Sequence, residues 1–258
     1  MGQWSGGSNH YRLILIYPHS DVSLFLTRFF IRDSDMPIRN TMNRFFMLML
    51  VTVVGCGESA EESKKRLERE TQKKVEQETL KRIQAELKSS GSFTDEDAEY
   101  LSNRYKNELY LISDLTSITN EQAEILSKVE SLRLDGLTSL TDEQAESLSK
   151  VKGLYLDGLT SITDAQAKSL SKVEILVLSG LPTVTDKQAE ILSEVRTLNL
   201  SGLKTLTDQQ AEYLSKVYWL ELRGIESITE TQAQSLSKVK YLYIPISSFE
   251  LVNQYKTP

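Results

Sequence analysis

The sequence predicts an α/β solenoid in which every repeat supplies one strand and one short helix. The first observation behind this prediction is a period of 22 residues, which chains built from stacked structural repeats typically show. The second is that each copy reads first as an alternating strand and then as a capped helix. An early copy, "FTDEDAEYLSN", stands 25 residues ahead of the next and is therefore three residues longer. The threonine that marks the same place in each copy falls at Thr94, Thr119, Thr141, Thr163, Thr185, Thr207 and Thr229.

The strand half of a repeat is seen in residues 129–151, "VESLRLDGLTSLTDEQAESLSKV". Apolar and polar residues alternate in "SLRLD", which is the two-residue period of a strand. Leu132 and Leu134 are expected to point inward, and Ser131, Arg133 and Asp135 outward. Gly136 follows, and it permits a tight turn that a residue with a Cβ atom resists.

The helix half begins at a threonine that is a good N-cap. In the same repeat Gln144 lies three residues after Thr141 and completes a T-x-x-Q capping box, while Asp142 suits the positive end of the helix dipole. Ala145 and Leu148 then fall on one helical face. The box recurs at Thr119/Gln122, Thr163/Gln166, Thr185/Gln188, Thr207/Gln210 and Thr229/Gln232.

The complete frame, V-x-x-L-x-L-x-G-L-x-x-[ILV]-T-D-x-Q-A-x-x-L-S-K, resembles the leucine-rich repeats, and its second half is similar to the cysteine-containing subtype and bacterial relatives of it. The resemblance covers about seven units over residues 91–244. It implies a curved solenoid with a parallel sheet on the concave face and short helices on the convex face. One position departs from the family, which usually places Asn or Cys three residues after the second strand leucine. That position is Leu137, Leu159, Leu181, Leu203 and Ile225 here, so we expect the turn to be satisfied in another way, through a tighter turn at the glycine.

Two segments flank the repeats. Residues 245–258 break the frame, because Pro245 interrupts the strand, and we expect them to form a C-terminal cap in which Phe249, Leu251 and Val252 cover the core. Residues 56–90 read as a charged helical tether with Glu–Lys and Glu–Arg pairs four residues apart. Leu80, Ile83 and Leu87 keep helical spacing there. This spacing leaves two possibilities, a coiled-coil dimer or a spacer helix whose last two turns dock on the first repeat.

Cys56, the only cysteine of the chain, ends the stretch "MNRFFMLMLVTVVGC". An arginine and an apolar run of about ten residues precede it, which is the pattern of a signal peptide and too short for a membrane span. The sequence V-V-G-C resembles a bacterial lipobox, which implies a signal peptide over residues 42–55 and lipid attachment at Cys56. The alternative is a buried strand with an ordinary core cysteine. Gly57 favours the outer over the inner membrane, and residues 1–41 are expected to be non-translated or disordered, with translation starting at Met42.

Net charge and residue composition exclude several classes of partner and site. A net charge of −6 argues against a nucleic-acid partner, which requires clustered Lys and Arg. His10 and His19, the two histidines, lie far upstream of the repeats, so the sequence offers no Cys/His metal set and no cofactor, and most familiar nucleophile–base pairs are absent. We therefore expect a lipid-anchored protein of the bacterial cell envelope that is not an enzyme and binds an unidentified protein ligand. The alternative is an architectural envelope protein with no specific ligand.

Candidate binding residues are the outward strand positions, because these vary between repeats while the leucines, glycines and capping residues do not. The candidates are Arg133, Tyr155, Asn199, Trp219, Glu221, Arg223, Tyr241 and Tyr243. Neighbouring strands lie about 4.8 Å apart, so the candidates of the last two repeats are predicted to form one patch. Trp, Tyr and Arg are the residue types enriched at energetic hot spots of interfaces. In the alternative, Trp219 and Tyr241 pack beneath the C-terminal cap.

Overall fold

The computed structural model describes residues 59–110 and 112–256, and the chain divides into two units, Met1–Glu68 and Arg69–Pro258. The signal peptide, Cys56 and the upstream extension all lie outside the described residues. The helix α2 (Ala60–Ser90) crosses the boundary between the units. Everything that follows about the repeats concerns the second unit.

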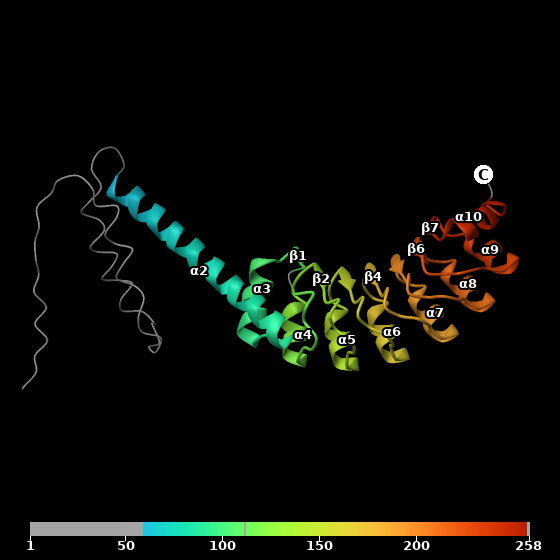
Figure 1. Cartoon of the computed structure of the whole chain (residues 1–258), viewed down its shortest axis with the longest axis horizontal. Coiled ribbons are helices and arrows are strands. Elements are labelled where there is room, and N and C mark those ends of the chain that lie inside the picture. The colour runs from blue at the N-terminus through green and yellow to red at the C-terminus, as the bar shows by residue number, and fades with distance from the viewer. Residues whose placement is uncertain (1–58, 111, 257–258) are drawn as a thin grey trace, which may run out of the picture. The chain divides into compact units, whose positions relative to one another are not determined.

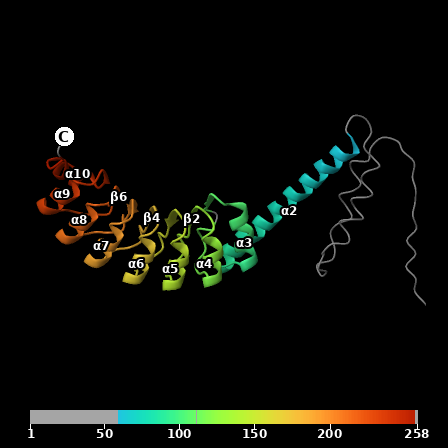
Figure 2. The same cartoon turned by 180° about the vertical axis from the view of Figure 1, so that it is seen from behind.

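The second unit is an α/β solenoid, the architecture that the resemblance to leucine-rich repeats implied, with a seven-stranded parallel sheet whose strands follow the order of the chain. Helices lie side by side along the convex side and strands along the concave side (Figures 1 and 2). The strands are β1 (Glu108–Leu109), β2 (Ser131–Arg133), β3 (Gly153–Tyr155), β4 (Ile175–Val177), β5 (Thr197–Asn199), β6 (Trp219–Glu221) and β7 (Tyr241–Tyr243). The helices are α3 (Asp95–Arg104), α4 (Asn120–Leu126), α5 (Asp142–Leu148), α6 (Asp164–Leu170), α7 (Asp186–Leu192), α8 (Asp208–Leu214), α9 (Glu230–Leu236) and α10 (Ile246–Asn253).

The strands pair without any shift in register, so equivalent residues of successive repeats stand next to each other. Leu132 pairs with Leu109 on one side and with Leu154 on the other, and the same leucine continues through to Leu242. The inward leucines are buried, together with an alanine and a leucine from each of the helices α3 to α9. Each buried leucine side chain contributes roughly 1.5–3 kcal/mol relative to an exposed one. This stacking holds helices of seven residues, which are too short to be stable alone in water.

The capping boxes predicted from the sequence are confirmed. In α6 the Thr163 hydroxyl accepts a hydrogen bond from the Gln166 backbone N–H at 3.0 Å, and the Gln166 side-chain oxygen accepts one from the Thr163 N–H at 2.9 Å. The glutamine also makes a third bond that the sequence did not reveal. Its Nε2 donates to the carbonyl of Leu140 in the preceding repeat at 2.8 Å, and equivalent bonds of 2.8 to 2.9 Å join the other repeats from Gln122 to Gln232.

The turn after each strand closes without the usual Asn or Cys. The N–H of Leu137 donates to the carbonyl of Leu134 at 3.1 Å, and the same bond follows the next four strands. The predicted tight turn is therefore present, but the reason for its glycine differs from the expected one. Among the glycines of the described residues, only Gly91 has a left-handed backbone, with φ of 65°. A Cβ atom on Gly136 would instead lie 2.6 Å from the backbone oxygens of Ser113 and Leu115. Glycine is needed because two turns approach each other closely.

At the N-terminal end of the repeats, the last turns of α2 dock on the first repeat, as the spacer alternative expected. Ile83 and Leu87 are buried and belong to the core. Arg82 forms an ion pair with Asp97 of α3, and Arg104 of α3 forms one with Glu76 at 3.3 Å. The repeat stack is thus covered at this end by both apolar and charged contacts.

At the C-terminal end, α10 begins directly after Pro245. Val252 is buried, and Leu251 packs partly buried against the core. The expectation that Phe249 helps to cover the core is wrong, because 41% of its side chain is exposed. The segment is a helix rather than an alternating strand, and the face that packs inward carries Ser248 and Val252.

Candidate interaction surface on the concave face

The outward side chains of neighbouring strands are brought together by the unshifted register. Trp219 pairs with Tyr241, and Glu221 pairs with Tyr243. At the other end of the sheet Arg133 pairs with Tyr155. The predicted binding residues therefore gather into two groups, one at each end of the concave face.

The first group, which we call the C-terminal aromatic cluster, consists of Tyr218, Trp219, Tyr241 and Tyr243. The Trp219 ring stacks on Tyr243 with centroids 5.1 Å apart and lies 5.2 Å from Tyr241. Tyr218 meets Tyr241 edge-on at 5.3 Å. Tyr241 and Tyr243 remain 42% and 39% exposed, so the alternative in which Tyr241 packs beneath the cap does not hold. Four aromatic rings form one continuous, solvent-accessible surface.

Glu221 holds polar groups in place around this cluster. One of its carboxylate oxygens accepts a hydrogen bond from the Trp219 indole N–H at 3.4 Å. The other accepts one from the Asn199 side chain at 3.2 Å and pairs with the Arg223 Nε at 3.3 Å. The Arg223 guanidinium also lies 5.3 Å from the centre of the Tyr243 ring. The sequence predictions for these residues described a patch, and the structure adds that its members are bonded to one another.

The second group, which we call the N-terminal cluster, centres on Arg133. Its guanidinium lies 4.7 Å from the Tyr155 ring and 5.3 Å from the Tyr110 ring, and it pairs with Asp135 at 3.5 Å. Burial, and then the neighbouring Asp157 carboxylate, raise the pKa of Asp135. Burial also raises the pKa of Tyr155. Arg133 thus has its ion-pair partner and both of its ring contacts within the N-terminal cluster.

Sequence reasoning missed two members of these groups. Tyr110 was overlooked because the first unit carries three extra residues, yet the leucine before it pairs with Leu132 and could have identified the position. Tyr218 precedes the strand and is therefore not on an alternating outward position. It joins the cluster because its ring reaches the next strand.

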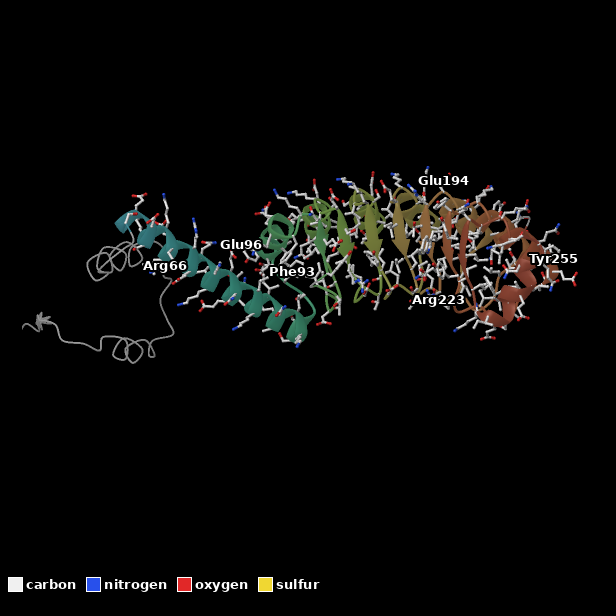
Figure 3. All side chains as sticks on the ribbon, turned by 90° about the horizontal axis from the view of Figure 1, so that it is seen from above. Arg66, Phe93, Glu96, Glu194, Arg223 and Tyr255 are labelled. Carbon is white, nitrogen blue, oxygen red and sulfur yellow. The ribbon has the colours of Figure 1, made fainter. Side chains whose placement is uncertain are left out.

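The ends of the strands define two edges of the repeat array. Glu194, which precedes β5, and Arg223, which follows β6, lie at opposite edges when the unit is viewed from above (Figure 3). Arg196, two residues after Glu194, has its guanidinium 5.3 Å from the Tyr218 ring. The C-terminal aromatic cluster therefore lies between two arginines, Arg196 near the N-terminal ends of the strands and Arg223 near their C-terminal ends.

Two further findings concern other kinds of site. Within residues 59–110 and 112–256, no group of three or more His, Cys, Asp or Glu side chains is arranged to hold a metal ion. None of the helices in the described part of the chain is long and apolar enough to cross a membrane.

Comparison with known proteins finds similarity among the solved structures but no match in sequence. No family model matches the chain, and no curated protein matches it in sequence. The solved structures include the crystal structure of an internalin (inlF) from Listeria monocytogenes str. 4b F2365, with a TM-score of 0.41 and 19% sequence identity. The matched region covers 67% of this chain and 52% of that one, so the match spans about half the length of the internalin chain. A similarity of this size supports no statement about function.

Proposed function

We propose that the protein is a non-enzymatic, lipid-anchored binding or scaffold protein of the bacterial cell envelope, which uses the concave face of its repeats for protein–protein interaction. The observation that carries this proposal is the C-terminal aromatic cluster, in which Trp219, Tyr241 and Tyr243 lie side by side and exposed next to Arg223. Residues of these types supply most of the binding energy at protein interfaces.

The cluster is not needed for the repeat fold. The core is already closed beneath it, since Leu220 of β6 is fully buried and Leu242 of β7 is 8% exposed. Soluble proteins rarely expose a continuous apolar surface to water unless that surface binds a partner. Trp and Tyr side chains also lose little conformational entropy on binding, and Glu221 already restrains Trp219 and Arg223. These properties favour a prearranged binding surface.

The anchor is proposed from the sequence pattern around Cys56. The apolar run, the V-V-G-C motif and the cysteine's being the only one in the chain support lipid attachment at that residue, and Gly57 supports the outer membrane. The charged helix α2 follows shortly after and has 31 residues, which correspond to about 46 Å at ~1.5 Å per residue. A helix of this kind is suited to act as a tether between a lipid anchor and a binding domain.

The proposal is tested by removing the cluster while keeping the fold. Trp219→Ala combined with Tyr243→Ala is expected to abolish capture of partners from a bacterial envelope extract by the immobilised protein, with little change in melting temperature. The matched control is Phe249→Ala, which removes an exposed aromatic ring of the terminal helix outside the concave strands. The control is expected to capture the same partners as the unmodified chain.

Two results would count against the proposal. If the double variant captures the same partners as the unmodified chain, the concave cluster is not the site. If the unmodified chain captures nothing that the double variant fails to capture, the architectural alternative without a specific ligand is favoured.

A further inference from the structure

We propose that the segment bound by the C-terminal aromatic cluster is acidic: an extended peptide segment of the partner protein, with two carboxylates about four residues apart and an apolar or aromatic side chain between them. This inference rests on the proposed function and specifies the chemistry of the ligand. Three features of the concave face support it, namely its charge distribution, its unpaired cations and the positions of its two arginines.

Charge is unevenly distributed along the sheet. On and beside the first three strands, acidic residues outnumber the two basic ones, Arg133 and Lys152; the acidic ones are Glu108, Glu130, Asp135 and Asp157. On and beside the last three strands the order is reversed, since Arg196, Arg223 and Lys240 outnumber Glu221. The protein as a whole has a net charge of −6, so the basic character of this end is a local property. An acidic ligand is therefore attracted to the last strands.

In the part of the chain that the structure describes, more of the cations lack an ion-pair partner at the basic end than at the acidic end. At the acidic end Arg133 pairs with Asp135, and Lys152 pairs with Glu130 at 3.2 Å. At the basic end neither Arg196 nor Lys240 has an ion-pair partner within the described residues. Arg223 pairs with Glu221 through its Nε, and its side chain remains 62% exposed. Guanidinium groups with free N–H donors bind carboxylates through pairs of charge-assisted hydrogen bonds.

Ring contacts hold both guanidinium groups over aromatic faces. Arg196 lies over Tyr218 and Arg223 over Tyr243, each at 5.3 Å. A positioned guanidinium loses less conformational freedom when it meets a carboxylate than a free side chain does. The arginines are thus prepared for a ligand that carries charge beside apolar surface.

The separation of the two arginines gives the spacing of the carboxylates. Arg196 stands opposite Tyr218 in the strand register, because Thr197 pairs with Trp219. Arg223 is five residues further along the next strand, which corresponds to about 16 Å at ~3.3 Å per residue. Successive side chains of an extended peptide point to opposite faces, so two carboxylates that both face the sheet are an even number of residues apart. Four residues span about 13 Å, and the long arginine side chains cover the remaining distance. A ligand that runs parallel to the strands reaches both arginines and crosses the aromatic cluster between them.

The test uses the fluorescence of Trp219. The chain has two tryptophans, so the full chain carrying Trp4→Phe reports on the cluster alone. The probes are three synthetic peptides of eight residues, identical except at positions 2 and 6, which hold Glu, Gln or Lys, with Phe at position 4 on the same face. We expect the Glu peptide to change the emission of Trp219 in a saturable way, with an affinity that falls steeply between low salt and ~0.5 M salt. The Gln peptide is expected to bind at least about tenfold more weakly.

Substitutions then locate the contacts. Arg196→Gln and Arg223→Gln are each expected to weaken the Glu peptide by about fivefold, as losing a solvent-accessible charge pair does. Arg133→Gln, at the other end of the face, is expected to leave its affinity unchanged. The inference is overturned if the Gln or Lys peptide binds as well as the Glu peptide. Absence of a saturable change up to ~1 mM Glu peptide overturns it as well.

Failure of this inference can be told apart from failure of the proposed function. If envelope partners are lost on Trp219→Ala with Tyr243→Ala but retained with Arg196→Gln and Arg223→Gln, the concave face binds a partner that is not acidic. If the emission of Trp219 changes with protein concentration in the absence of peptide, the ligand is a second copy of this chain. That outcome also overturns the acidic-partner inference.

Discussion

At the scale of the residue, one side chain links each repeat to the one before it. Gln166 accepts a hydrogen bond from Thr163 within its own repeat and donates one to the Leu140 carbonyl of the preceding repeat. The glutamine is almost fully buried, so neither bond is replaced by water if it is lost. A capping box accepts Glu as readily as Gln, yet a carboxylate has no N–H to donate.

This difference gives a prediction for Gln166→Glu. The substitution satisfies the capping box but places a carboxylate beside the Leu140 carbonyl, so we expect the free energy of unfolding to fall by about 1–3 kcal/mol, the usual cost of an unsatisfied buried group. Urea denaturation at neutral pH measures it. The control is Gln209→Glu, an exposed residue in the first turn of α8 where a negative charge suits the helix dipole, with an expected change within about ±0.5 kcal/mol. Equal stability of the two variants would show that the bond between repeats contributes nothing.

At this scale, the sequence alone predicts the hydrogen bonds within one repeat but not those between repeats. The Thr–Gln spacing identifies a capping box because both partners lie within one turn of helix. The bond from Gln166 to Leu140 spans 26 residues, and no spacing rule links those positions. The same holds for Gly136, whose neighbours Ser113 and Leu115 belong to the preceding repeat.

At the scale of the element, the N-terminal end depends on a charged contact between two helices. Asp97 of α3 closes the capping box with Thr94 and also pairs with Arg82 of α2. Burial by itself raises the pKa of Asp97, but hydrogen bonds from Arg82 and Thr94 outweigh it, and the pKa lies below its ordinary value. The carboxylate is thus stabilised in its ionised form by the folded structure.

A pH dependence follows from this lowered pKa. Between the pKa of an unfolded aspartate, about 3.9, and the lower folded value, the unfolded chain binds a proton that the folded chain does not. The stability contributed by Asp97 is therefore complete above that range and is lost as the pH falls through it. We expect Asp97→Asn to be less stable than the unmodified chain by about 1 kcal/mol at pH 7, since Arg82 is half exposed to solvent. The difference should shrink towards pH 3.

Urea denaturation of both chains at several pH values measures this difference. Asp95→Asn is the control, because Asp95 is an exposed residue in the same helical turn with no ion-pair partner among the described residues. A difference between Asp97→Asn and the unmodified chain that stays constant from pH 7 to pH 3 would show that the Arg82 contact does not stabilise the ionised carboxylate.

The two ends also show where prediction of elements from sequence stops. The docking of α2 was one of two alternatives, because the spacing of Leu80, Ile83 and Leu87 suits either a repeat or a second helix as partner. The role of Phe249 was misjudged, because residues 245–258 have no repeat pattern to fix their secondary structure. In the helix, Phe249 lies at the margin of the face that carries Ser248 and Val252, where 41% of its side chain stays exposed.

At the scale of the whole molecule, the 22-residue period determines most of what could be predicted. Once one leucine of each strand is aligned, residues 22 positions apart become neighbours in the sheet, as Trp219 and Tyr241 are. The members of the candidate site on strands β6 and β7 were therefore accessible to sequence reasoning. The stacking of Trp219 on Tyr243 and the central position of Glu221 were not, because side-chain geometry depends on rotamers that the period does not specify.

The anchor and the repeats are proposed to act independently, and Cys56→Ser tests this division. The described core is built from residues that begin at Ile83, so the substitution is expected to leave the circular dichroism and melting temperature of the repeats unchanged. Removing the site of lipid attachment should move the protein from the membrane pellet to the supernatant, because stable anchoring requires more than one acyl chain and the serine variant carries none. Ser59→Ala, three residues downstream, is the control and should remain in the pellet.

A Cys56→Ser protein that still sediments with membranes after a high-salt wash would contradict lipid anchoring at this residue. Partner capture by that variant in solution, at the level of the unmodified chain, would show that the binding face functions without the membrane.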